Sequence, residues 1–446
     1  MSEDNTITRF APSPTGQIHI GNARSAILNW VYAKKNKGKF ILRIDDTDKQ
    51  RSKDEFIYSI KEDLKWLNID WDLSFKQSER LTKYEEKIKE LKSKNRLYAC
   101  FETQEELSLK RKSLLSSGKP PIYDRRSLKL SDKEKEILIS QGRKPHWRFL
   151  LENKIITWYD KIRGQIEFDS KNLSDPILIR EDGSLLYHLP SVIDDISEKI
   201  TDIIRGEDHI TNTAFHIQIF ESLNSKPPNF GHHSLLVDKS GKGLSKRLGS
   251  ISIENIKNKG FESISILNYL LTVGTSQNIK NEIELLNLIQ SFELNNLAKS
   301  TAKFDKDDLV IINSDLLKKM SFESVEEKLK NLGISNINIQ FWNFIKNNLS
   351  FMKDSVEWWK IISSNEVFIQ KKDEFMELCA SVLPNEPFNE DTWDEWINSI
   401  KVKTDKKGKS LFMPIRFALT GKDTGPELKY MLPLLSRQII LKRLGS

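Results

Sequence analysis

The sequence predicts an α/β fold followed by a largely helical C-terminal half. Three observations support this prediction. Residues 9–35 read as the end of a strand, a Pro/Gly turn and a helix, and a short apolar run at 40–44 then closes a β-α-β unit. The same alternation of strands and helices returns at 186–209, after an interval of different texture. Beyond about Asp238, helical periodicity dominates to the C-terminus.

The first β-α-β unit is predicted from residue spacing. After Gly21, apolar residues recur at helical spacing, and Gly38 follows a lysine cluster that suits the negative end of a helix. The run 40–44 is typical of a buried parallel strand. Acidic residues at 45–48 follow that strand directly. Because ligands bind at the carboxyl ends of such strands, these residues indicate a ligand crevice.

The next elements follow in order along the chain. An apolar face made by Ile57, Ile60, Leu64 and Leu67 predicts a helix, and we expect helices to continue to about Asn95. From about 97 to 184 the chain shows turns, isolated Trp residues and short alternating runs such as 155–159. We interpret this interval as an insertion into the first domain. Strand and helix patterns resume at 186–195 and 200–209, followed by a helical stretch through Phe220, so the crevice would be built from both sides of the insertion.

Composition sets broad limits. A chain of 446 residues is long enough for several domains. The 70 Lys and Arg residues against 63 Asp and Glu give a net charge of +7, which permits a polyanionic partner, although a coding bias toward Lys, Asn and Ile explains it equally well. Cys100 and Cys379 have no neighbouring Cys or His at metal-ligand spacing, so we expect neither a structural zinc ion nor a disulfide. With no leader or long apolar run, we expect a cytoplasmic enzyme with no membrane partner.

Two distant segments carry the features of a phosphate site. His19 and Gly21 stand at the start of the first helix, where backbone N–H groups and the helix dipole favour an anion. Lys242-Gly-Leu-Ser-Lys-Arg247 is a glycine-flanked cationic segment. Neither a Walker A sequence nor G-x-G-x-x-G is present. Taken singly, the first segment is better explained as a capped helix start and the second as a solvated turn. Together they favour nucleotide chemistry.

The wider context resembles a known family. Ala11-Pro-Ser-Pro-Thr-Gly-Gln-Ile-His-Ile-Gly-Asn22 resembles the HIGH signature of class I aminoacyl-tRNA synthetases, and within them of the bacterial-type glutamyl-tRNA synthetases. Further segments match in family order and cover nearly the whole chain: 42–48 with Arg51-Ser52, 192–195, 204–209, 243–247 as the KMSKS counterpart, Phe304-Asp305, 414–421 and Gly425-Pro426.

The resemblance implies a fold and a domain order. A Rossmann-like catalytic domain would comprise 1–96 and 185–237, interrupted by an acceptor-stem-binding (connective) domain at 97–184. A stem-contact region carrying the KMSKS-like loop would follow at 238–320. An all-helical anticodon-binding domain would occupy 321–446. In that last part we expect most of Trp342, Trp358, Trp359, Trp393 and Trp396 to be core residues rather than base-stacking ones. The basic clusters 401–409 and 437–443 are candidates for phosphate contacts or solvated faces.

The resemblance also implies a reaction and its site residues. ATP with Mg²⁺ would activate L-glutamate to glutamyl-adenylate, and the 3′ end of tRNA(Glu), or of tRNA(Gln), would receive the glutamyl group; a monomer is implied. His19 and Lys246 would steady the phosphates as the catalytic residues. The implied ATP-binding residues are His19, Gly21, Asn22, Asp208, Leu236, Gly243, Leu244, Ser245, Lys246 and Arg247. The implied glutamate-binding residues are Arg9, Ala11, Ser13, Asp45, Tyr187, Ser191 and Arg205, with Asp45 at the ammonium and Arg9, Tyr187 and Arg205 at the side-chain carboxylate.

Four departures from the family pattern are visible. Asp45 stands where relatives commonly have Glu, Ser191 where some have Asn, and Gly243 in place of the first KMSKS lysine, with Lys242 next to it. The zinc site of some relatives is missing, since Cys100 is isolated and Tyr123-Asp-Arg-Arg126 offers no sulfur. We therefore expect the insertion to be held by packing alone.

Other functions remain as alternatives. A non-discriminating or tRNA(Gln)-charging glutamyl enzyme differs only in the tRNA it accepts. The shortened paralogue that glutamylates a modified tRNA base lacks the roughly two hundred residues that follow the KMSKS counterpart here. Glutaminyl-tRNA synthetase has a β-barrel C-terminal part, whereas this one is predicted to be helical. A catalytically silent tRNA-binding protein is disfavoured by His19, Arg9, Arg205 and Lys246.

Overall fold

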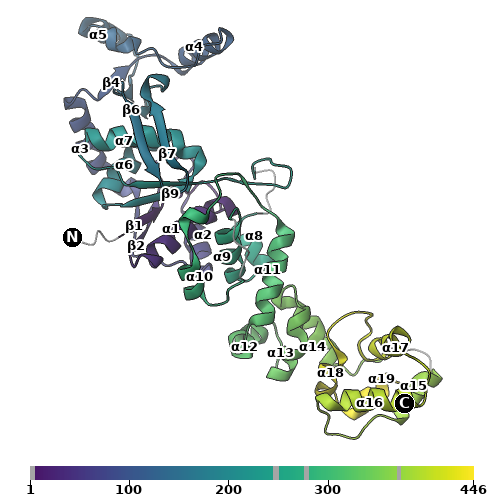
Figure 1. Cartoon of the computed structure of the whole chain (residues 1–446). Coiled ribbons are helices and arrows are strands. Elements are labelled where there is room, and N and C mark those ends of the chain that lie inside the picture. The colour runs from purple at the N-terminus through teal and green to yellow at the C-terminus, as the bar shows by residue number, and fades with distance from the viewer. Residues whose placement is uncertain (1–5, 245–250, 276–280, 369–372, 446) are drawn as a thin grey trace. The chain divides into compact units, whose positions relative to one another are not determined.

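The computed structural model describes residues 6–244, 251–275, 281–368 and 373–445. The chain divides into two compact units. Unit 1 comprises Met1–Ile256, Ile266–Lys280 and Glu284–Asp305, and unit 2 comprises Lys257–Ser265, Asn281–Ile283 and Lys306–Ser446. Figure 1 shows that strands gather in unit 1, whereas unit 2 is helical.

Unit 1 begins with the expected β-α-β unit. Strand β1 (Ile7–Phe10) pairs in parallel with β2 (Lys39–Ile44), and α1 (Ile20–Lys35) connects them. Helix α2 (Asp54–Trp66) follows and buries Ile57, Ile60 and Leu64, as the apolar spacing predicts.

The expectation of continuous helices to Asn95 is wrong at one element. Residues Leu73–Lys76 form β3, a third parallel strand beside β2. This strand has only four residues, none of them buried, so it carries no alternation that a sequence pattern could reveal. The helical pattern resumes after it in α3 (Leu81–Ser93).

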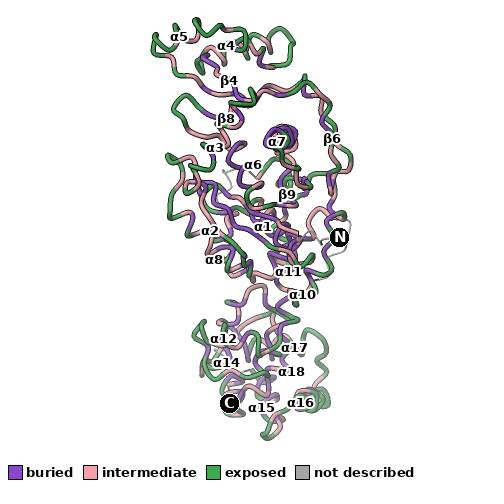
Figure 2. Tube along the Cα trace, turned by 90° about the vertical axis from the view of Figure 1, so that its left-hand side faces the viewer, coloured by how far each residue is buried: buried purple, intermediate pink, exposed green. Residues whose placement is uncertain are grey.

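A second sheet has the order β7-β6-β10-β9. Its strands are β6 (Ile155–Asp160), β7 (Gly164–Asp169), β9 (Asp202–Gly206) and β10 (Asn229–His233). Strand β10 runs parallel to both β6 and β9, so β6 and β7, which belong to the segment 97–184, extend the sheet that β9 and β10 form. Helices α6 (His188–Ser197) and α7 (Ile210–Ser222) pack together, and Figure 2 shows them largely buried. The Thr201 amide donates to the Ile7 carbonyl over 2.9 Å, which joins the two sheets.

The rest of the insertion forms an antiparallel sheet with exposed helices. Strands β4 (Leu97–Cys100), β5 (His146–Phe149) and β8 (Ile177–Ile179) make the sheet. Helices α4 (Gln104–Ser116) and α5 (Asp132–Ser140) bury no residue and begin with capping boxes.

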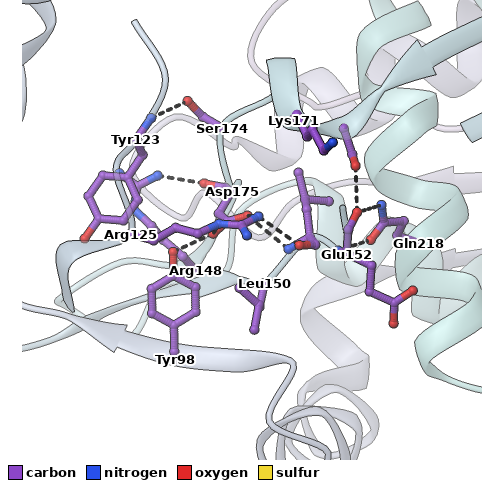
Figure 3. A network of polar contacts seen from close by, with 12 residues as sticks. Tyr98, Tyr123, Arg125, Arg148, Leu150, Glu152, Lys171, Ser174, Asp175 and Gln218 are labelled. Carbon is purple, nitrogen blue, oxygen red and sulfur yellow. Dashed lines mark hydrogen bonds and ion pairs between the residues drawn. The ribbon is translucent and has the colours of Figure 1, made fainter. Parts of the chain in front are cut away.

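A buried carboxylate, that of Asp175, organises the insertion (Figure 3). Arg125 donates to it through Nη2 and Nε over 2.8 and 2.9 Å, and the Tyr98 hydroxyl donates over 2.7 Å. The Leu151 amide adds a bond of 3.0 Å, and Arg148 donates to the Asp175 carbonyl over 2.7 Å. The prediction that packing alone holds the insertion is therefore wrong. The sequence could not reveal this network because its members lie up to 77 positions apart.

The remaining elements of unit 1 continue from β10. Strand β11 (Leu236–Val237) pairs in parallel with β12 (Ala302–Lys303). The helices α8 (Ile253–Asn258), α9 (Ser263–Thr272) and α10 (Leu285–Ser291) lie between these two strands in the sequence. Helices α8 and α9 belong partly to unit 2, which includes Lys257–Ser265.

Unit 2 is built from helices around one core. The helices are α11 (Lys306–Lys319), α12 (Phe322–Asn331), α13 (Ile339–Ile345), α14 (Ser355–Ser363), α15 (Glu374–Ser381), α16 (Glu390–Val402), α17 (Lys409–Thr420), α18 (Leu428–Met431) and α19 (Arg437–Arg443). Trp342, Trp358 and Trp396 are buried in this core, and Trp359 and Trp393 pack against it half-buried. The prediction that most of these Trp residues are core residues is confirmed.

One candidate for a phosphate contact is buried. Arg443, in the basic cluster 437–443, has no exposed surface and donates to the carbonyls of Leu419 and Ser364 over 2.8 Å each. It closes the end of the helical core instead of facing solvent. Separately, among the described residues no helix is both long and apolar enough to cross a membrane.

Candidate active site

A cavity of about 1090 Å³ opens in unit 1, where the carboxyl ends of β1, β2 and β9 meet. It brings together the two sets of predicted site residues. Its wall includes Arg9, Ala11, Ser13, His19, Gly21, Asn22, Asp45, Tyr187, Arg205, Asp208, Leu236, Gly243 and Leu244. Ser191 is not among the lining residues, and Ser245, Lys246 and Arg247 lie outside the described residues.

One wall of the cavity is the start of helix α1. The His19 ring is the N-cap: its Nδ1 accepts from the amides of Gly21 and Asn22 over 3.1 and 3.4 Å. A neutral ring with Nδ1 as acceptor carries its proton on Nε2, which is then a donor. A Cβ at Gly21 would lie 3.0 Å from the His19 Cε1, so glycine lets the ring fold onto the helix start. The same histidine therefore caps the helix and lines the cavity.

The two described flanks of the KMSKS-like loop meet the cavity and the helix start, respectively. Before the loop, Val237 forms an antiparallel bridge with Gly243, and Gly243 and Leu244 line the cavity. After the loop, Ser252 forms a bridge with His19, and the Ile20 amide donates to the Ile251 carbonyl over 3.0 Å. The segment before the loop therefore lines the cavity, and the segment after it contacts the start of α1.

The turn before the loop is ordered by one side chain. Asp238 Oδ1 accepts from the amides of Ser240 and Lys242 over 2.8 and 2.9 Å, and the Asp238 amide donates to the Lys242 carbonyl over 2.8 Å. The Ser240 hydroxyl also donates to Oδ1, and chiefly through this bond it lowers the pKa of the Asp238 carboxyl. These bonds hold Lys242 and Gly243 at the cavity.

Leu236 lines the cavity, and its backbone groups are not used by the neighbouring strand. In the β11–β12 pair, Ala302 donates to the Leu235 carbonyl over 3.3 Å and Phe304 donates to the Val237 carbonyl over 2.8 Å. In a parallel ladder of this register, the amide and carbonyl of Leu236 point away from β12. The role of Leu236 in binding ATP stays a prediction.

Arg205 contributes a buried guanidinium to the lining of the cavity. Its donors meet three uncharged acceptors: Tyr187 Oη at 2.9 Å, Thr213 Oγ1 at 2.6 Å and His232 Nε2 at 3.4 Å. No carboxylate among the described residues forms an ion pair with it, and it is only 6% exposed. Burial lowers its pKa. A buried cation without a counter-ion, facing a cavity, is suited to an anionic ligand.

Arg9 provides a second guanidinium. Its Nε donates to Asp195 Oδ1 over 3.2 Å, and its two terminal nitrogens form no hydrogen bond within the described part of the chain. Arg9 and Arg205 both line the cavity and are both at least nine-tenths buried. Together they offer two planar guanidinium groups, each of which can bind a carboxylate through two N–H donors.

Asp45 lines the cavity and also forms an ion pair with Arg43. Arg43 donates to its Oδ1 over 2.6 Å and to its Oδ2 over 3.1 Å, and donates to Asp195 Oδ1 over 2.9 Å. Burial, opposed by the Arg43 charge, raises the pKa of Asp45 to about 6. Each Asp45 oxygen keeps a second lone pair, so the predicted contact with an ammonium stays a prediction.

Ser191 binds Arg43 from inside the protein. It is fully buried on α6, its Oγ accepts from Arg43 Nη2 over 2.9 Å, and its carbonyl accepts from Arg43 Nη1 over 3.1 Å. The structure thus places it behind Arg43 rather than at the cavity wall. Motif position alone could not distinguish these two places, because Ser191 lies in the same helix as the motif 192–195.

Several cavity residues were missed in the sequence. Arg24 is fully buried on α1, donates to the carbonyls of Ser234 and Val273 over 2.8 Å each, and has a pKa lowered to about 10 by burial. Glu207 accepts from the Leu235 amide over 3.0 Å and from Arg163. Glu207 lies inside the matched motif 204–209, and Arg24 lies two residues after the motif that ends at Asn22, so position relative to these motifs was the available signal. Ser25, Asn29, His209 and His233 also line the cavity without having been predicted.

Three histidines surround the Tyr187 ring. The ring centroids of His188, His209 and His216 lie 5.4, 5.6 and 5.5 Å from that of Tyr187. Burial lowers the pKa of His188 and of His209 to about 4, and lowers the pKa of His216 well below its usual value. At neutral pH they are uncharged, so they add no positive charge beside Arg205.

The insertion contains one cluster of metal-ligating groups. Ligand atoms of Cys100, Glu102 and His146 lie within 4.8 Å of one another, so the prediction that Cys100 is isolated is wrong. The chemistry nevertheless does not fit a cation. Arg126 donates to the Glu102 carboxylate over 2.8 Å, and burial followed by the Arg148 charge lowers the pKa of His146 to about 4. Two neighbouring guanidinium groups oppose a bound metal ion. The absence of zinc stays a prediction.

Comparison with known proteins gives the family. The model for the catalytic domain of class I tRNA synthetases (E and Q) matches residues 5–311, and an anticodon-binding-domain model matches 323–446. The chain is 47% identical over 443 residues to glutamate–tRNA ligase 1 of Rickettsia massiliae (strain Mtu5) and to that of Rickettsia felis (strain ATCC VR-1525 / URRWXCal2), covering 99% of each chain.

Solved structures agree in fold. A glutamate tRNA ligase from Elizabethkingia meningosepticum CCUG26117, in complex with its amino acid, superposes with a TM-score of 0.85 at 26% identity and 99% coverage of both chains. Glutamate-tRNA synthetase from Elizabethkingia anophelis gives 0.83 at the same identity and coverage. The α/β catalytic part with a helical anticodon-binding part is the predicted fold, and the chain belongs to the class I tRNA synthetases of the glutamyl and glutaminyl (E and Q) family.

Proposed function

We propose that this protein is a glutamate–tRNA ligase, which activates L-glutamate with ATP and transfers it to the 3′ end of tRNA(Glu). One observation carries the proposal: a single cavity is lined both by two buried arginines and by a histidine-capped helix start. The arginines suit a substrate with a side-chain carboxylate, and the helix start suits a triphosphate. The relatives' names agree with this assignment.

The first step is an in-line displacement. A carboxylate oxygen of glutamate bonds to the α-phosphorus of ATP, the bond to the bridging oxygen breaks, and pyrophosphate leaves. No side-chain nucleophile is needed, so the protein's task is positioning and charge stabilisation. The α1 amides and the His19 Nε2–H would donate to phosphate oxygens, and Lys246 would follow the leaving pyrophosphate. A hydroxyl of the terminal adenosine of tRNA then attacks the adenylate carbonyl, and AMP leaves.

Mg²⁺ would accompany ATP. Of the three carboxylates at the cavity, Asp45 is bound to Arg43 and Glu207 to Arg163, whereas Asp208 is exposed. This donor set fits an ion held mainly by phosphate oxygens and water, with Asp208 as the available protein oxygen. In that place the ion would neutralise phosphate charge.

Different residues of the amino-acid pocket would bind different groups of glutamate. Arg205, Tyr187 and Arg9 would bind the side-chain carboxylate, Ala11 and Ser13 would line the pocket, and Asp45 would meet the ammonium. Arg43, held by Ser191, would orient Asp45.

Successive segments of the chain would bind different parts of the tRNA. We propose that 97–184 binds the acceptor stem, 238–320 contacts the stem, and 321–446 binds the anticodon region. Acceptance of tRNA(Gln) is the second candidate, favoured by Asp45 in a place where relatives carry Glu. The enzyme would act as a cytoplasmic monomer.

The direct test is aminoacylation. The purified protein, ATP, Mg²⁺ and radiolabelled glutamate should charge tRNA(Glu), and separate assays with purified tRNA(Glu) and tRNA(Gln) compare the two tRNAs. Charging of tRNA(Glu) alone supports the proposal as stated, and comparable rates on both support the non-discriminating alternative. No charging of either tRNA, with intact tRNA binding, would show a silent binding protein.

The raised pKa of Asp45 predicts a pH-dependent KM for glutamate. Because this pKa is about 6, the carboxyl is ionised at pH 7.5 and becomes protonated as the pH falls, while the glutamate ammonium stays charged. The attraction therefore weakens below pH 6. One unit below that pKa, KM should be roughly tenfold higher than at pH 7.5, since about one carboxyl in ten remains ionised.

The measurement is ATP–pyrophosphate exchange, with tRNA present, between pH 5 and 8. Asp45→Asn is the control, because it keeps the shape and removes the titration. Its KM should be high throughout and should not rise further through Asp45. Parallel pH profiles for the two proteins would rule out Asp45 as the titrating group.

A further inference from the structure

A buried carboxylate and imidazole stand behind Arg205. Asp160 is the last residue of β6, and His232 lies beside it on β10; both have no exposed surface. Asp160 Oδ2 is 2.5 Å from His232 Nδ1. Its other oxygen, Oδ1, accepts from the backbone amides of Ile162, Arg163 and His232 over 3.0 Å each. Four contacts therefore fix the orientation of this carboxylate.

This arrangement sets the tautomer of His232. Burial lowers the pKa of His232 despite its contact with Asp160, so the ring is neutral at pH 7. Burial alone would raise the pKa of Asp160, but the hydrogen bond and electrostatic attraction of His232, together with the backbone amides of His232 and Arg163, lower it and keep the carboxylate ionised. An ionised carboxylate only accepts, so the His232 proton is on Nδ1 and the Nε2 lone pair faces the other way.

The Nε2 lone pair of His232 faces Thr213 and Arg205. Nε2 lies 2.9 Å from Thr213 Oγ1 and 3.4 Å from Arg205 Nε. Thr213 Oγ1 in turn accepts from Arg205 Nη2 over 2.6 Å. The arginine is thus held in place by neutral acceptors, while the negative charge of Asp160 lies one imidazole ring away. Direct pairing with a carboxylate would have neutralised the charge that a ligand needs.

We propose that Asp160, His232 and Thr213 are positioning residues for the amino-acid substrate, which aim Arg205 at its side-chain carboxylate through the Nδ1–H tautomer of His232. This inference rests on the proposed glutamate–tRNA ligase activity. It also gives the insertion a part in amino-acid recognition, because Asp160 belongs to the segment 97–184. A displaced Arg205 fork would weaken binding of the carboxylate while leaving the ATP side of the cavity intact.

The decisive variant is Asp160→Asn. Three backbone amides surround the Oδ1 position, so the side-chain oxygen stays there and the amide NH₂ faces His232. Nδ1 must then accept, and the proton moves to Nε2, where it opposes the Arg205 Nε–H. We expect the KM for glutamate to rise about 10- to 100-fold, with the KM for ATP within about twofold of the parent.

Two further measurements separate positioning from a merely structural role. Long-range ¹H–¹⁵N correlations of histidine-labelled protein should show Nδ1–H for His232 in the parent and Nε2–H in the variant. Asp202→Asn is the matched control: Asp202 is a buried carboxylate of the neighbouring strand β9, bound to Lys161 and Thr201, and does not line the cavity. It should leave the KM for glutamate unchanged.

A second pair of variants covers the case in which Asp160→Asn does not fold. His232→Gln keeps an acceptor near the Nε2 position, whereas His232→Phe, placed beside the stacked ring of Phe230, keeps the ring shape without one. The KM for glutamate should rise with Phe and recover in large part with Gln. Equal KM values for the two, or a moved His232 proton with an unchanged KM, would overturn the proposal. If the parent protein does not activate glutamate, the proposed ligase activity is refuted instead. The tautomer of His232 in the parent protein can still be measured, because the NMR experiment does not depend on activity.

Discussion

Replacing Arg205 by Met should lower kcat/KM for glutamate by about three orders of magnitude or more. A site built to bind a charged group loses about this much when its buried partner is removed. Methionine approximates the volume of arginine and removes a buried cation that has no acidic partner among the described residues. Thermal stability should therefore change little, because an unpaired buried charge does not stabilise the fold. The measurement is ATP–pyrophosphate exchange with tRNA present, together with a melting curve.

The control for this variant is Arg96→Met. Arg96 is a partly buried arginine of the same unit that donates to the Leu150 carbonyl over 3.1 Å and does not line the cavity. It should keep kcat/KM for glutamate near the parent value. An Arg205→Met protein with normal glutamate kinetics would show that the substrate carboxylate is bound elsewhere.

Replacing His19 by Asn should separate helix capping from phosphate contact. Asparagine is among the best N-caps, so helix α1 should keep its cap and the melting temperature should change little. The shorter side chain cannot present a donor at the position of Nε2. We expect kcat for glutamate activation to fall about 10²- to 10³-fold, the usual cost of removing one donor to a developing charge.

Two companion variants make this result specific. His19→Ala removes cap and donor together and should lose about 1 kcal/mol of stability in addition to the activity. Ser321→Ala removes the N-cap of α12 in unit 2, where the Ser321 Oγ accepts from the Ser324 amide, and should lower stability without changing kcat. Full activity of His19→Asn would leave the histidine with a capping role alone.

The sequence predicted the elements whose patterns are local. Strand β2 and helices α1 and α2 were predicted because buried residues recur within a few positions, and the short strand β3 was missed because four half-exposed residues show no period. The site was predicted through ordered motifs, and thirteen of its residues line one cavity. The position of Lys246 lies outside the described residues, so its role stays a prediction.

Short contiguous motifs were enough to predict the family, most of the element order and thirteen of the residues that line the cavity. Which predicted residues reach the cavity, and which contacts hold them, depends on how the chain folds. Ser191 lies behind Arg43, and Arg205 meets His232 and Thr213 instead of a carboxylate. Asp160 reaches the same network from 45 positions away in the chain. Hydrogen bonds act between side chains that folding brings within about 3 Å, and no local pattern encodes that proximity.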